Sequence, residues 1–210
     1  GRRFGGRSAR SGSMGRPVPG VVAGIVRPRE DGGVDVVEAP GEVGELALKP
    51  GWPSMFRGYL NNEERYRKCF RDGWYLSGDL AKRDADGYYW FVGRADDVFK
   101  ASDYKISPFE LESVLIEHPA VAEAAVVPAP DAMRLAVPKA YISLAAGWAP
   151  DRVTADAIFA HARANLAPYQ RIRRIEFAEL PKTISGKIRR VELRNRENAV
   201  AELPDEFRES

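Results

Sequence analysis

The sequence predicts an α+β protein, with a β-rich first part followed by a small domain in which helices flank a sheet. Three observations lead to this prediction. Short runs rich in Val, Tyr and Phe fill residues 21–93 and are separated by Gly, Pro and Asp. Beyond Arg94, strand-like and helix-like patterns alternate. With 44% hydrophobic and 10% aromatic residues, the 210-residue chain can bury a core, which excludes wholesale disorder.

The first part of the chain is expected to contain mainly antiparallel strands. Residues 1–13 are rich in Gly, Ser and Arg and carry little to bury, so they are expected to be mobile or foreign to the native protein. The runs that follow indicate an antiparallel meander. Its strands are predicted at 21–26, 34–38 and 45–49.

A short helix and a hairpin complete the first part. The helix is predicted near 62–70, with Asn61 or Asn62 as its N-cap residue. The hairpin covers 74–93, because residues that tolerate a tight turn, 84–87, separate two aromatic strand patterns.

The pattern changes after Arg94, and we place the domain boundary there, which gives domains 1–94 and 95–210. Ser107 and Glu110 have the spacing of a capping box around Pro108, which predicts a helix that ends near His118. The remaining predicted elements are strands at 121–127, 139–144 and 173–177 and helices at 155–166 and 188–203.

Composition excludes several classes of protein. The 32 basic and 30 acidic residues are dispersed and give a formal charge of +2, which does not indicate a nucleic-acid partner. Cys69 is the only cysteine, so no intrachain disulfide or multi-cysteine metal site is expected, and a cytoplasmic location fits. No uncharged apolar run approaches the roughly 20 residues that a membrane span needs.

Three side chains are candidates for chemistry, each with a plain structural alternative. Lys187 follows Gly186 in a turn and could extend its ammonium group into a neighbouring cleft, or could simply be a solvated loop lysine. Asp79 could accept hydrogen bonds from vicinal hydroxyl groups such as those of a ribose, or could cap a turn. Arg94 could bind a hydroxyl or phosphate group, or form a surface ion pair.

A series of motifs resembles, in order, the later core motifs of the AMP-forming acyl-CoA synthetases of the adenylate-forming superfamily. The resemblance covers nearly the whole chain beyond residue 14 and implies the end of a large domain plus a complete small domain. The motifs are Gly44-Glu-Leu46, Arg57-Gly-Tyr-Leu60, Gly73-Trp-Tyr-Leu-Ser-Gly-Asp-Leu80, Asp86-Gly-Tyr88, Phe91-Val-Gly-Arg-Ala-Asp-Asp97, Ile106-Ser-Pro-Phe-Glu-Leu-Glu112, His118-Pro-Ala-Val121 and Leu180-Pro-Lys-Thr-Ile-Ser-Gly-Lys187.

The resemblance implies a two-step reaction. A carboxylate attacks the α-phosphate of Mg·ATP to give an acyl-adenylate and pyrophosphate, and the thiol of CoA then displaces AMP. In that family the residue matching Asp79 holds the ribose hydroxyls, and those matching Arg94 and Lys105 lie near the nucleotide. Asp96 matches the hinge of the small domain, and Lys187 matches the lysine between the reacting carboxylate and the α-phosphate. The ligands of Mg²⁺ are expected upstream of this chain.

Two departures from the family pattern matter. Ser102-Asp-Tyr-Lys105 stands where the family usually has Ser-Gly-Tyr-Arg, so Asp103 adds bulk and negative charge where the CoA arm should pass. Ser102, Asp103 and, by a loose alignment, Arg163 are the expected CoA contacts, although Arg163 could equally be a solvated helix residue. The family's Ser/Thr/Gly-rich phosphate loop has no match here, so the isolated chain is expected to be inactive.

The resemblance therefore predicts part of an ATP-dependent carboxylic acid:CoA ligase, with acetate or another short fatty acid as the favoured acid. A non-catalytic binding module that keeps the fold is one alternative, and an adenylating enzyme without CoA transfer is another. Exposed sheet edges in the β-rich part also predict association into a homo-oligomer.

Overall fold

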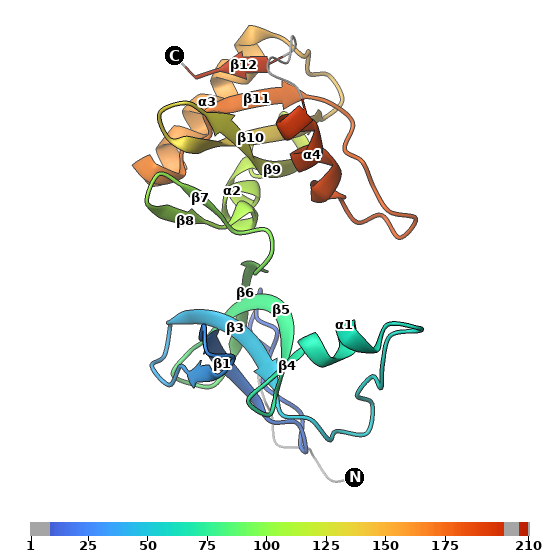
Figure 1. Ribbon diagram of the computed structural model, residues 1–210. Coiled ribbons are helices and arrows are strands. Elements are labelled where there is room, and N and C mark those ends of the chain that lie inside the picture. Colours follow the sequence, from blue (N-terminus) through green and yellow to red (C-terminus); the bar gives the residue numbers. More distant parts are fainter. Residues whose placement is uncertain (1–8, 200–205, 210) are drawn as a thin grey trace. The chain divides into compact units, whose positions relative to one another are not determined.

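The computed structural model describes residues 9–199 and 206–209, and these form two compact units (Figure 1). Unit 1 ends at Asp96 and unit 2 begins at Asp97, whereas the sequence placed the boundary after Arg94. The predicted α+β class is confirmed, because both units contain a β-sheet and the second adds helices on its faces. No helix among the described residues is long and apolar enough to cross a membrane.

Unit 1 is built on a six-stranded antiparallel sheet. The path of hydrogen-bonded neighbours is β2-β1-β3-β5-β4, and β6 pairs with β5. Its strands are β1 (Ala23–Pro28), β2 (Val34–Val36), β3 (Val43–Leu48), β4 (Phe70–Arg71), β5 (Trp74–Arg83) and β6 (Tyr89–Arg94).

The predicted meander is wrong in its strand order. A meander would place β2 between its sequence neighbours, whereas β1 pairs with both β2 and β3. One reason lies in Gly44 of β3, where a Cβ atom would stand 2.7 Å from Ile25 Cγ2 and 2.7 Å from the carbonyl oxygen of Val26. The missing side chain lets β3 pack directly on β1, and β2, with three residues, is left as an edge strand.

The short helix of unit 1 is α1 (Glu63–Lys68). Its N-cap residue is Asn62, as predicted, and the Asn62 side chain accepts a hydrogen bond from the backbone N–H of Arg65 at 3.1 Å. This contact satisfies one of the donors that the first helical turn leaves unpaired.

The β5–β6 hairpin is closed by Asp84, whose Oδ1 accepts hydrogen bonds from the backbone N–H groups of Asp86 and Tyr88. Arg10 donates to the carboxylates of Asp84 and Asp86. Arg10 therefore contacts the hairpin, the mobility expected for residues 1–13 stays a prediction, and residues 1–8 of that stretch lie outside the described residues.

Unit 2 combines a four-stranded sheet, in the order β12-β11-β10-β9, with a separate β7–β8 hairpin. Strands β10 and β11 are parallel, and the other neighbours are antiparallel. Its strands are β7 (Phe99–Ala101), β8 (Tyr104–Ile106), β9 (Val121–Asp131), β10 (Leu135–Leu144), β11 (Arg174–Phe177) and β12 (Glu206–Arg208). Its helices are α2 (Pro108–Leu115), α3 (Arg152–Asn165), the 3₁₀ turn η1 (Pro168–Gln170) and α4 (Arg190–Ala199).

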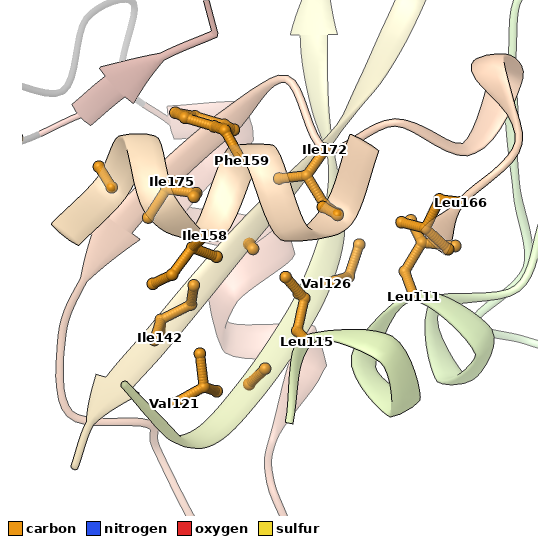
Figure 2. Packing of buried hydrophobic residues seen from close by; sticks show 14 of the residues in the cluster. Leu111, Leu115, Val121, Val126, Ile142, Ile158, Phe159, Leu166, Ile172 and Ile175 are labelled. Atoms are coloured by element: carbon orange, nitrogen blue, oxygen red, sulfur yellow. The ribbon is translucent and has the colours of Figure 1, made fainter. Parts of the chain in front are cut away.

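Different helices cover the two faces of this sheet because side chains alternate along a strand. Val126 and Ile142 face α2 and α3 and belong to the main core. Val127 and Tyr141, one residue out of phase, pack with Leu193 of α4 in a smaller cluster. Figure 2 shows the main core closely, with Leu111 and Leu115 of α2 and Ile158 and Phe159 of α3 over the strands.

The predicted capping box of α2 is not formed. Ser107 occupies the N-cap position, but its side chain makes no capping hydrogen bond. Glu110 instead accepts a hydrogen bond from the amide nitrogen of Gln170 at 2.9 Å, so a contact with η1 takes the place of the local one. The helix ends at Leu115, close to the predicted end near His118.

Candidate functional site

Asp79, Arg94 and Asp96 form one ion-pair cluster at the end of unit 1. Asp79 on β5 lies opposite Arg94 on β6 in the antiparallel register. Arg94 Nη1 donates to Asp79 Oδ1 at 2.9 Å, and Arg94 Nε donates to Asp96 Oδ1 at 3.1 Å. Burial opposes the charge of Arg94, but these hydrogen bonds outweigh it and raise the pKa of the guanidinium group. Three residues singled out from the sequence are therefore brought together.

A bulge in β5 determines the direction of the Asp79 side chain. The β3–β5 register passes from the pair Ala47–Leu76 to the pair Glu45–Leu80, so three residues of β5 stand opposite a single residue of β3. Gly78, in this bulge, has φ +76°, and a Cβ atom there would lie 3.0 Å from Arg94 Nη2. Such a bulge redirects side chains out of the regular alternation of a strand. Glycine is therefore needed beside the Asp79–Arg94 pair.

Glu45 supports this bulge, and sequence reasoning assigned it no role. Its Oε1 accepts a hydrogen bond from the backbone N–H of Gly78 at 2.9 Å. Burial raises the pKa of Glu45, and the Gly78 hydrogen bond and the charges of Arg71 and Arg94 oppose that rise. The motif Gly44-Glu-Leu46 was the signal that could have identified it.

Lys187 lies on an exposed, internally bonded loop of unit 2. The backbone N–H of Thr183 donates to the carbonyl oxygen of Lys187 at 2.8 Å, and the N–H of Lys187 donates to Thr183 Oγ1 at 3.1 Å. Gly186 has φ +81°, which closes the turn. Within the described residues, Lys187 forms no ion pair, whereas Lys182 of the same loop binds Glu123 at 2.7 Å. The loop thus presents one uncompensated ammonium group.

Ser102, Asp103 and Lys105 lie on the β7–β8 hairpin of unit 2. Ser102 and Asp103 form its two-residue turn, in which Ser102 has φ +54° and its N–H donates to the carbonyl oxygen of Arg134 at 3.1 Å. Lys105 is exposed and stands opposite Lys100 across the hairpin. The hairpin therefore carries two neighbouring positive charges beside its turn.

A pocket of about 350 Å³ opens beside this hairpin. Its floor includes Tyr104 stacked on Tyr169, with ring centroids 4.5 Å apart. Arg171 lines the pocket, and its Nε is buried without a hydrogen-bond partner among the described residues. Arg134 and Arg173 also line it. A guanidinium group with one unsatisfied N–H, beside further arginines, fits an anionic ligand.

Arg163 does not line this pocket, and its expected contact with CoA stays a prediction. On α3 it forms an ion pair with Glu209 at 3.1 Å, and Arg173 binds the other oxygen of the same carboxylate at 2.7 Å.

The described residues contain no group of three or more His, Cys, Asp or Glu side chains that could hold a metal ion. We assign no step in this chain to Mg²⁺.

Comparison with known proteins shows which proteins this chain resembles. The model of the AMP-binding enzyme C-terminal domain matches residues 110–187. The chain is 50% identical over 189 residues to 4-hydroxybutyrate–CoA ligase 1 of Metallosphaera sedula, covering 89% of this chain and 33% of the relative. It is 46% identical over 181 residues to acetyl-coenzyme A synthetase of Bacillus subtilis, covering 85% of this chain and 31% of the relative. The chain thus spans about a third of the length of these curated relatives.

Solved structures give the same result. The anthranilate CoA ligase AuaEII in complex with anthranoyl-AMP is 41% identical, with a TM-score of 0.79 over 90% of this chain and 36% of that one. The amide bond synthetase McbA from Marinactinospora thermotolerans is 32% identical, with a TM-score of 0.73 over 88% of this chain and 36% of that one.

Proposed function

Since the chain belongs to the AMP-forming acyl-CoA synthetases of the adenylate-forming superfamily and carries their C-terminal domain, we propose that it works as part of an acid:CoA ligase. In the first step a carboxylate attacks the α-phosphate of ATP and pyrophosphate leaves. In the second step the CoA thiol attacks the acyl carbon and AMP leaves. A short aliphatic acid is the favoured substrate, because the relatives named above include an acetyl-CoA synthetase and a 4-hydroxybutyrate–CoA ligase.

The free ammonium group of Lys187 is the observation that carries this proposal. As the carboxylate attacks, negative charge shifts from it to the α-phosphate oxygens and the departing pyrophosphate, and a positioned cation stabilises that transition state. Lys187 has no carboxylate partner among the described residues to neutralise it, and its loop is held closed by three backbone-mediated bonds. An exposed ammonium group on a loop whose backbone is held in this way is suited to meet an anion supplied by another part of the enzyme.

The Asp79–Arg94 pair is suited to hold the ribose of the nucleotide. Arg94 occupies Oδ1 of Asp79, which fixes the carboxylate and leaves Oδ2 able to accept hydrogen bonds from hydroxyl groups. Hydrogen bonds to a charged acceptor contribute about 1.5–3 kcal/mol each. In this proposal Asp79 and Arg94 bind ATP, and Asp96 is the hinge about which unit 2 changes orientation between the two steps.

The arginine-lined pocket is suited to the phosphate groups of CoA. Arg134 and Arg171 supply positive charge, Arg173 shares its charge with Glu209, and Ser102 also lines the pocket. Asp103, the next residue in the turn, adds a negative charge near this lining. If Asp103 blocks the second step, the enzyme would release its acyl-adenylate to another acceptor, and the similarity to an amide bond synthetase favours keeping this alternative.

The test compares two lysines of one loop in a protein that joins this chain to the AMP-binding region of a relative. We expect Lys187→Ala to lower the rate of acid-dependent ATP–pyrophosphate exchange by about 10²–10³-fold, the usual cost of removing one positioned donor. Lys182→Ala is the matched control, because Lys182 is already paired with Glu123, and should keep nearly the parental rate.

Thioester formation from a supplied acyl-adenylate separates the two steps. Lys187→Ala should leave it nearly unchanged, because that reaction starts after the α-phosphate has been attacked. Equal losses in Lys182→Ala and Lys187→Ala would contradict the role of Lys187. A parental protein that makes acyl-adenylate but no thioester would instead support the alternative without CoA transfer.

A further inference from the structure

A second ion cluster in unit 2 lies outside the sites described above. It joins Asp97, Glu112 on α2, and Arg190 and Arg194 on α4. Arg190 Nε donates to Glu112 Oε1 at 2.9 Å, and Arg190 Nη1 lies 3.5 Å from Asp97 Oδ2. Arg194 Nη1 donates to Asp97 Oδ1 at 2.9 Å. One guanidinium group therefore joins three segments that are far apart in the sequence.

This cluster is anchored to the core of the unit. Glu112 is 7% exposed, and its Oε1 also accepts a hydrogen bond from the backbone N–H of Val126 on β9 at 2.8 Å. The side chains of Asp97 and Glu112 are only 14% and 9% exposed. Charged groups so placed interact more strongly and more directionally than surface pairs.

The Lys187 loop begins and ends next to the same cluster. The backbone N–H of Arg189 donates to the carbonyl oxygen of Pro181 at 2.8 Å, and Lys182 forms a β-bridge with Ile188. These contacts close the base of the loop one residue before Arg190, the first residue of α4. The position of Arg190 thus fixes where the loop leaves the body of unit 2.

Charge and apolar packing together hold this end of α4. Leu193, the fourth residue of the helix, is buried in the smaller core cluster, and Ile188 packs against that cluster. Arg190 adds directed contacts with Glu112 and Asp97. Apolar contact is non-directional, whereas a two-point guanidinium–carboxylate contact fixes both position and angle.

We propose that Asp97, Glu112, Arg190 and Arg194 are positioning residues that hold the Lys187 loop in a fixed orientation relative to the hinge end of unit 2. The inference rests on the proposed function, which gives Lys187 and Asp96 their roles. Asp97 directly follows Asp96, the proposed hinge, and Arg190 directly follows the base of the Lys187 loop. The cluster therefore connects these two positions. A rotation about Asp96 then carries Lys187 as a rigid part of the unit.

Hydrogen exchange in the 210-residue chain tests the cluster without requiring activity. The amide protons of Thr183, Gly186 and Lys187 report on the loop, because each is bonded within it. We expect Arg190→Gln to speed their exchange by about tenfold or more, since local opening becomes easier, while the amides of β10 keep their rates. Arg189→Gln is the matched control, because the Arg189 side chain pairs only at the surface with Glu192.

Asp97→Asn serves as a second variant that removes one charge with little change in shape. It should speed exchange at the same three amides, and unchanged loop exchange in both Asp97→Asn and Arg190→Gln overturns the proposal. In the joined enzyme, Arg190→Gln should lower kcat for pyrophosphate exchange while KM for ATP stays the same. Failure of the proposed function would give a different result. Lys187→Ala would leave pyrophosphate exchange unchanged, while Arg190→Gln would still speed hydrogen exchange at the loop amides.

Discussion

Lys139 is the most deeply buried charge among the described residues, with no exposed side-chain surface. Its ammonium group lies 2.8–3.0 Å from carboxylate oxygens of Glu176, Glu197 and Glu206, which come from β11, α4 and β12. Arg196 pairs in turn with Glu176, which offsets part of the excess negative charge. A buried charge is tolerable only when it is paired in this way, so these contacts tie the C-terminal elements to the centre of the sheet.

Tyr141, on the same strand, makes the stability of unit 2 fall as the pH rises into the alkaline range. Burial, followed by the hydrogen bond that its hydroxyl donates to Glu197, raises the pKa of Tyr141. The folded state therefore keeps this proton to higher pH than the unfolded state, whose tyrosines ionise near pH 10. The stabilising contribution is complete below about pH 10 and is lost above it, by up to about 1.4 kcal/mol per pH unit.

Urea unfolding at several pH values between 7 and 11 checks this prediction. Tyr141→Phe should lower the free energy of unfolding at pH 7, because Glu197 loses a partner, and should make its decline above pH 10 shallower. Some decline should remain, since burial opposes the charge of Lys139 but its three carboxylate partners raise its pKa overall. Tyr104→Phe, at an exposed position, should leave the profile unchanged; an identical profile for Tyr141→Phe would contradict the argument.

At the scale of elements, a single substitution can test the close approach of the β1 and β3 backbones. Gly44→Ala places a methyl group 2.7 Å from Ile25 Cγ2 and from the Val26 carbonyl oxygen, so β1 and β3 must move apart. Overpacking of this kind costs about 1–3 kcal/mol. Gly58→Ala is the control, because a Cβ atom there meets nothing within 4 Å. We expect thermal unfolding of unit 1 to shift downward for Gly44→Ala alone; equal midpoints would show that β3 can move at no cost.

Strand positions were more predictable than strand partners. Apolar runs and turn residues located β1, β2 and β3, because these signals are local. The order β2-β1-β3 was not predictable, since it depends on which strands can approach β1, and the missing side chain of Gly44 is one contribution that no periodic pattern reveals. Strands β7, β8 and β12 have three residues each, which is too short for a periodic pattern. The capping box at Ser107 failed because Gln170, distant in sequence, takes the side chain of Glu110.

The candidate site was predictable to the extent that motifs carry it. The motif containing Asp79 and the one containing Arg94 fall on paired strands, so their contact follows from the β5–β6 register. Arg171 and Arg173 could not be distinguished from solvated arginines, because the pocket that they line forms only where η1 and the β7–β8 hairpin meet. Arg190 and Asp97 are 93 residues apart, and no local pattern indicates that they touch.

At the scale of the whole molecule, the residues of the proposed reaction are divided between two units. Asp79 and Arg94 lie in unit 1, whereas Lys187 and the arginine-lined pocket lie in unit 2. Neither unit has both a ribose-binding carboxylate and a catalytic cation in this proposal. A reaction built this way depends on how the units are oriented in each step, which is the role proposed for Asp96.

The final prediction concerns this 210-residue chain on its own, which spans about a third of the length of its curated relatives and has no match to the family's phosphate loop. We expect the purified chain to show no acid-dependent ATP–pyrophosphate exchange, because Lys187 can stabilise charge only on phosphate groups that are already held in place. Joining it to the AMP-binding region of a relative should restore exchange. Circular dichroism must show that the isolated chain is folded, and robust exchange by that folded chain would mean that its own residues bind ATP productively.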